Sequence, residues 1–142
     1  MAERVNEMIS VLRTWQGLER QAMNDTAEIQ ETTNSRFIRM VMEIIRHDSL
    51  MHHRVQQFLI DSVTKEDIAV TREDIQEIWE KIEAHDRMEK KTIELAEGLK
   101  AKAWNPVHKS LLDYLLRDEA KHDTMLQQLN AMKTEIGKAS GA

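Results

Sequence analysis

The sequence has no cysteine, one proline, four glycines and only six aromatic residues (three Trp, two Phe and one Tyr) in its 142 positions. The absence of cysteine excludes disulfides, Cys-ligated zinc or iron–sulfur sites and thiolate nucleophiles. Any metal ion would therefore have to be held by His, Asp or Glu. The scarcity of glycine and proline leaves few places for turns and favours helix along most of the chain.

Basic clusters and long apolar runs are also lacking. The 20 Lys and Arg residues against 25 Asp and Glu residues give a net charge of −5, which predicts no nucleic-acid partner. No apolar run approaches the roughly 20 residues that a membrane-spanning helix needs. The charged amino terminus does not resemble a signal peptide. We therefore expect one domain over residues 1–142, cytoplasmic and without membrane contact.

Apolar residues recur at steps of three and four, which is typical of amphipathic helices. The pattern predicts four helices, at about residues 3–31, 35–61, 71–103 and 107–135, followed by a flexible tail at 136–142. Ser35 is a candidate N-cap, Thr71 with Asp74 resembles a capping box, and Pro106 suits a first helical turn. Short turns within the first and last helix pairs predict an all-α, antiparallel four-helix bundle.

The two halves of the sequence resemble each other. The segment LERQA around Glu19 aligns with MEKKT around Glu89 at an offset of 70 residues. The segment that starts RHDSLMHH at Arg46 aligns with the one that starts RDEAKHDT at Arg117 at an offset of 71. The predicted bundle is therefore a duplicated helical hairpin.

Each predicted helix interrupts its apolar face with a carboxylate near its middle: Glu19, Asp48, Glu89 and Glu119. Halfway along the sequence between Glu19 and Asp48 lies a predicted turn, and the same holds between Glu89 and Glu119. Two antiparallel helices that are equally long on either side of a turn bring such residues to the same level, so the acids of each pair should face each other. Carboxylates that converge in a low-dielectric core must be protonated or paired with a cation. No Lys or Arg occupies these faces nearby, so we expect a metal ion.

Histidines occur at the same depth. His122 follows Glu119 by three residues, His85 precedes Glu89 by four, and His52 follows Asp48 by four, so each shares a helix face with an acid. The candidate metal ligands are therefore Glu19, Asp48, His52, His85, Glu89, Glu119 and His122.

This constellation resembles the ferritin-like di-iron carboxylate proteins, and in particular a rubrerythrin-related bundle without a rubredoxin module, over about residues 3–135. Glu19, Glu89, Glu119 and His122 match that pattern. The second helix departs from it. Asp48 replaces a glutamate and Met51 stands where a histidine is expected, so that His52 or His85 would supply the missing nitrogen.

The resemblance implies two iron ions, or manganese or a mixed pair, in the bundle core. It also implies Fe(II) oxidation, or reduction of O2 or peroxide, with electrons from an external donor.

Two alternatives remain open at this stage. The chain could be a non-enzymatic ferritin-like bundle that serves structure or interaction and retains a partial metal site. A hemerythrin-like oxygen binder ranks lower, because His85 and Glu89 fit its His-x-x-x-Glu step but the last helix lacks the His-x-x-x-His pair. A homodimer would cover outward residues such as Trp79.

Overall fold

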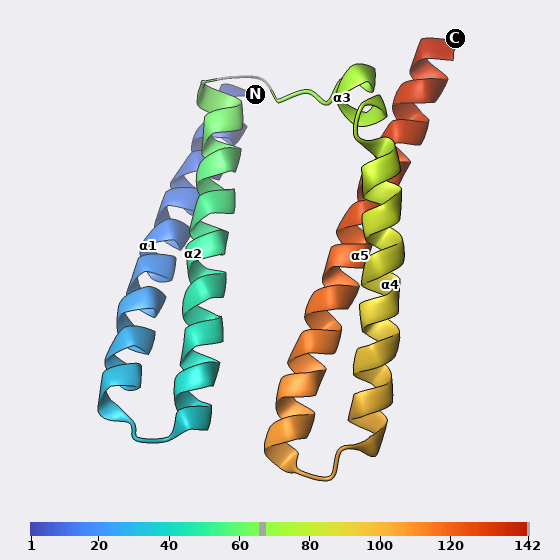
Figure 1. Cartoon of the computed structure of the whole chain (residues 1–142). Coiled ribbons are helices and arrows are strands. Elements are labelled where there is room, and N and C mark those ends of the chain that lie inside the picture. Colours follow the sequence, from blue (N-terminus) through green and yellow to red (C-terminus); the bar gives the residue numbers. More distant parts are fainter. Residues whose placement is uncertain (66–67, 142) are drawn as a thin grey trace. The chain divides into compact units, whose positions relative to one another are not determined.

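The computed structural model describes residues 1–65 and 68–141, with side chains up to residue 135. Its helices are α1 (Ala2–Thr32), α2 (Arg36–Thr64), α3 (Arg72–Gln76), α4 (Trp79–Lys102) and α5 (Pro106–Gly141) (Figure 1). The described residues contain no strand, so the predicted all-α class is confirmed. The chain divides into two compact units, Met1–Ile68 and Ala69–Ala142. Each unit is a helical hairpin.

The N-terminal hairpin consists of α1 and α2, joined by a short turn at the predicted place. Ser35 is the N-cap of α2, since its hydroxyl accepts a hydrogen bond from the Ile38 backbone N–H at 3.2 Å. The Ser35 backbone N–H in turn donates to the Thr33 hydroxyl at 3.1 Å. These local bonds satisfy backbone groups that would otherwise be left unpaired where the chain reverses.

The buried strip between α1 and α2 is more polar than the sequence predicted. Gln16, Thr26 and Gln56 are buried there, whereas Trp15 is 50% exposed. Gln16 Nε2 donates to Gln57 Oε1 at 3.0 Å, which links the two helices. The buried residues of α1 are Leu12, Gln16, Glu19 and Thr26, so polar side chains outnumber apolar ones on its inner face.

The C-terminal hairpin consists of α4 and α5, with α3 lying against α5. Its turn falls at the predicted position, and Pro106 is the first residue of α5, where its missing N–H costs nothing. Lys100 Nζ lies 2.7 Å from Asp113 Oδ1 and joins the two helices near this turn.

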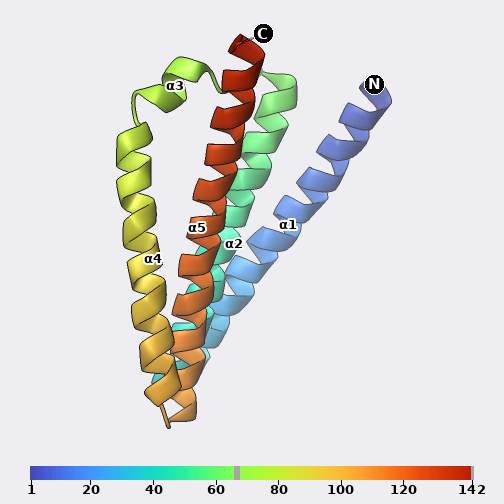
Figure 2. The same cartoon turned by 90° about the vertical axis from the view of Figure 1, so that its right-hand side faces the viewer.

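The single helix predicted at residues 71–103 is wrong, because the chain breaks at Glu77 and Ile78 into α3 and α4. The predicted capping box is present: the Thr71 hydroxyl accepts from the Asp74 N–H, and the Asp74 carboxylate accepts from the Thr71 N–H. Ile75 is 4% exposed, whereas Ile78, predicted on the same face, is 47% exposed. α3 is turned away from the axis of α4 (Figures 1 and 2). With this turn, the Ile75 side chain is buried and the Ile78 side chain is left exposed to solvent.

α5 continues to Gly141, through the segment predicted as a flexible tail; residue 142 lies outside the described residues. The flexibility of this segment stays a prediction. Across the described ranges, no helix has the length and apolarity to cross a membrane.

We expect Ser35→Ala to lower the free energy of unfolding by about 1 kcal/mol, because the first turn of α2 loses its side-chain cap. Ser35→Asp is the matched control, since aspartate caps as well as serine does. Urea denaturation measures both variants, and equal losses would show that the hydroxyl does not act as a cap.

Candidate metal centre

Glu89 in α4 meets Glu119 and His122 in α5. One ligand atom from each of these residues lies within 4.8 Å of the others. Glu119 and His122 share a face of α5 because they are three residues apart, and Glu89 faces them from α4. Among the residues that the structure describes, this is the sole group of three or more His, Asp or Glu side chains close enough to hold one ion.

Glu89 is the most constrained member of this cluster, with a side chain only 7% exposed. Its Oε1 lies 2.8 Å from His85 Nε2 and 3.5 Å from His122 Nδ1. Its Oε2 is buried and has no hydrogen-bond partner. A buried carboxylate oxygen without a partner is costly, so this atom calls for either a proton donor or a cation.

Glu119 is the second carboxyl group beside Glu89. The hydrogen bond between the two carboxyl groups raises the pKa of Glu119 above its ordinary value of 4.5 and lowers the pKa of Glu89, which His122 and His85 lower further. The Thr92 hydroxyl lies 2.9 Å from Glu119 Oε2 and 2.7 Å from the Glu89 carbonyl oxygen. Glu119 therefore takes up a proton more readily than a free glutamate does.

A second acidic pair, Asp86 and Asp123, lies one helical turn away, and the sequence analysis missed it. The hydrogen bond between these carboxyls raises the pKa of Asp123 and lowers that of Asp86. Lys90 Nζ lies 3.3 Å from Asp86 Oδ2, and Gln127 Nε2 donates to the same oxygen at 3.2 Å. The signal was present in the spacing, since Asp86 precedes Glu89 by three residues and so shares its helix face.

The N-terminal candidates are arranged differently. Glu19 is buried, and its Oε1 accepts a hydrogen bond from Trp15 Nε1 at 3.1 Å. His52 Nδ1 lies 3.4 Å from the same oxygen, so the structure brings His52 to Glu19. Asp48 is half-buried and does not complete a three-ligand group with them in the described part of the chain.

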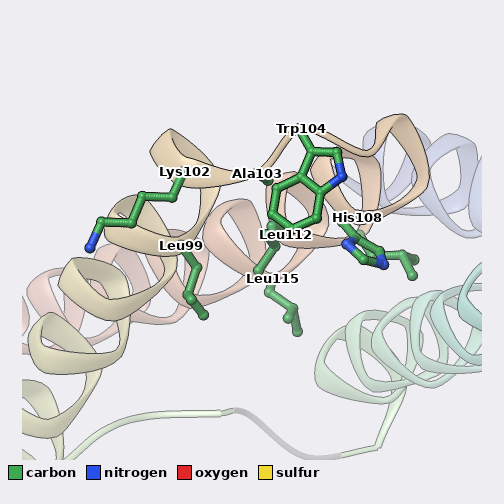
Figure 3. A pocket seen from close by; sticks show the side chains of 8 residues that line it. Leu99, Lys102, Ala103, Trp104, His108, Leu112 and Leu115 are labelled. Carbon is green, nitrogen blue, oxygen red and sulfur yellow. The ribbon is translucent and has the colours of Figure 1, made fainter.

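Two hollows of the C-terminal hairpin differ in character. A groove of about 390 Å³ lies at the turn between α4 and α5, where Leu112 and Leu115 lie beneath the Trp104 indole (Figure 3). Its lining contains no carboxylate, so it offers a metal ion no acid. A pocket of about 130 Å³ includes Asp86 and Gln127 and so adjoins the metal cluster.

Comparisons with known proteins bring no assignment: no family model matches the chain, and no similar curated protein or solved structure was found. The argument for function therefore depends on the residues themselves.

The carboxyl pair makes the stability of the metal-free protein depend on pH. Because the pKa of Glu119 is raised in the folded state, its stabilising contribution is present below its ordinary value of 4.5 and is lost as the pH rises through the raised value. In the presence of a chelator, we expect Glu119→Gln to reduce the loss of unfolding free energy as the pH rises above 4.5. Glu97→Gln, an exposed acid on α4, serves as the control. Identical pH profiles for wild type and Glu119→Gln would contradict the raised pKa of Glu119.

Proposed function

We propose that the C-terminal hairpin binds a divalent transition-metal ion, iron or manganese, through Glu89, Glu119 and His122. The observation that carries this proposal is the buried, unpartnered Oε2 of Glu89 beside a second carboxyl group and an imidazole. A mixed set of carboxylate oxygen and imidazole nitrogen suits Fe(II) or Mn(II). Structural zinc sites more often close four ligands around the ion, commonly with sulfur.

His85 has two uses in this centre. As a donor to Glu89 Oε1 at 2.8 Å it orients that carboxylate, as hydrogen bonds to metal-ligating groups commonly do. It also offers a second imidazole within one helical turn of Glu89. Thr92 orients Glu119 in the same way through its hydroxyl.

The activity that fits this centre is Fe(II) oxidation, or reduction of O2 or peroxide, as the resemblance to ferritin-like carboxylate proteins implies. The bound metal would supply the redox chemistry. The chain contributes Glu119, whose pKa is raised by the neighbouring Glu89, and half-exposed His85 and His122 side chains that leave a small oxidant access. Electrons would come from Fe(II) itself or from an external donor, as the resemblance implies.

We also propose that the two hairpins associate as an antiparallel four-helix bundle. Each hairpin exposes large apolar side chains, Val55 and Phe58 in one and Met88 and Leu95 in the other. Exposed apolar faces of this kind gain free energy when they are covered. The two-ion centre predicted from the resemblance additionally requires ligands from Glu19, Asp48 and His52, and it stays a prediction.

Metal binding can be tested directly. After anaerobic reconstitution with Fe(II) or with Mn(II), we expect about one ion per chain at the Glu89 site, with Glu119→Ala abolishing it and Glu97→Ala leaving it intact. A free ion concentration of 100 times the dissociation constant should raise the unfolding free energy by about 2.7 kcal/mol. Elemental analysis and thermal unfolding supply the two readouts. Reconstituted wild type without bound metal and with unchanged stability would overturn the proposal.

The same samples separate an enzyme from a metal-holding structural bundle. Oxygen or peroxide consumption by the Fe(II)-loaded protein, faster than by the same concentration of Glu119→Ala with Fe(II), supports the redox function. Stoichiometric metal binding with no acceleration would favour the structural alternative.

The proposed bundle has its own test. A monomer of 142 residues packed as one compact body should give a radius of gyration of about 15 Å in small-angle X-ray scattering, with the mass fixed by sedimentation. A monomer with a clearly larger radius would show that the hairpins stay apart.

A further inference from the structure

Equivalent positions of the two hairpins carry different ligands. We infer that the C-terminal hairpin alone binds the metal ion, and that Trp15 and Met51 keep the equivalent site of the N-terminal hairpin free of metal. This inference rests on the proposed function and deepens it, because it fixes the location and the number of ions.

The first difference lies in α1 and α4. At the offset of 70 residues, Trp15 corresponds to His85 and Glu19 to Glu89. The geometry is conserved: Trp15 Nε1 lies 3.1 Å from Glu19 Oε1, and His85 Nε2 lies 2.8 Å from Glu89 Oε1. Both side chains can donate a hydrogen bond to the buried acid, but the indole nitrogen has no lone pair for a metal, whereas imidazole does.

The second difference lies in α2 and α5. At the offset of 71, Met51 corresponds to His122, the imidazole three residues after the acid. A thioether is a soft ligand and suits Cu(I) better than Fe(II) or Mn(II). His52, one position later, lies 3.4 Å from Glu19 Oε1. The N-terminal hairpin therefore has one imidazole near its buried acid, where the C-terminal hairpin has two.

The charges differ in the same direction. At four corresponding positions, the C-terminal hairpin has four acids, whereas the N-terminal hairpin has two acids, a neutral amide and an imidazole. The corresponding pairs are Gln16 with Asp86, Glu19 with Glu89, Asp48 with Glu119 and His52 with Asp123. Fewer carboxylates give a weaker field for a divalent cation. The hydrogen bond from Trp15 instead satisfies Glu19 directly.

The test is a calorimetric titration of the full chain with Co(II), supported by elemental analysis. We expect one ion per wild-type chain, one for Glu19→Gln and none for Glu89→Gln. The double variant Trp15→His/Met51→His should bind two ions, because it restores both imidazoles. Trp79→His is the matched control, since Trp79 also donates to an acid four residues later, Glu83, but stands at neither of the positions Trp15 and Met51 that correspond to His85 and His122. This control should bind one ion.

The outcomes separate the inference from the proposed function. Two ions on wild type, with one lost in Glu19→Gln, would overturn the inference while the metal function stands. No ion on wild type, or undiminished binding by Glu89→Gln, would overturn the proposed function itself. A double variant that is folded by circular dichroism yet still binds one ion would refute the roles of Trp15 and Met51. If that variant does not fold, the Glu19→Gln and Glu89→Gln arms still decide where the ion binds.

Discussion

The contact between the carboxyl groups of Glu89 and Glu119 is the constraint around which the C-terminal hairpin is organised. Two carboxylates cannot both be ionised in a partly dry interhelical space without a positive charge or a proton between them. Two imidazoles and the Thr92 hydroxyl lie there, and Glu89 Oε2 remains without a hydrogen-bond partner. In the proposed function, a metal ion would bind these oxygen and nitrogen atoms and satisfy Glu89 Oε2. Its binding would then depend on pH, because protons and the metal ion compete for the same atoms.

The N-terminal hairpin also buries a glutamate, but satisfies it with different partners. It retains the buried glutamate at the same place in its repeat, but Trp15 donates a hydrogen bond to Glu19, and Gln16 stands where Asp86 stands in the other half. Neutral donors satisfy the acid there, so no cation is required. The two hairpins therefore align in sequence and share a buried glutamate, but the N-terminal one has fewer acids around it and a hydrogen bond from Trp15.

The sequence predicted the helices and turns well because these depend on local signals: the Ser35 cap, the Thr71–Asp74 capping box and Pro106 all act as expected. It failed at Ile78, because the break of the helix buries Ile75 while α3 lies against α5, a tertiary arrangement that periodicity does not contain. The depth of Glu19 and Glu89 was predictable from the repeat, and both are buried. The polar partner of each acid was not predictable from the repeat. His52 lies 3.4 Å from Glu19, although it is not on the line of apolar residues that contains the acids.

The polar inner strips also determine what each hairpin needs from its surroundings. Among the described residues the buried apolar side chains are few, namely Leu12, Ile60, Ile75 and Ala96. Hydrophobic burial inside a hairpin therefore supplies only a small part of the free energy that folding needs, and most of the apolar surface is left to be covered from outside. If the proposed bundle covers these faces and the proposed metal ion is bound, a surface that removes water from the half-exposed His85 and His122 would lower the local dielectric constant. The attraction between the cation and its carboxylates would then grow. The two proposals would in that case depend on each other, because a covered hairpin would hold its ion more tightly than an uncovered one.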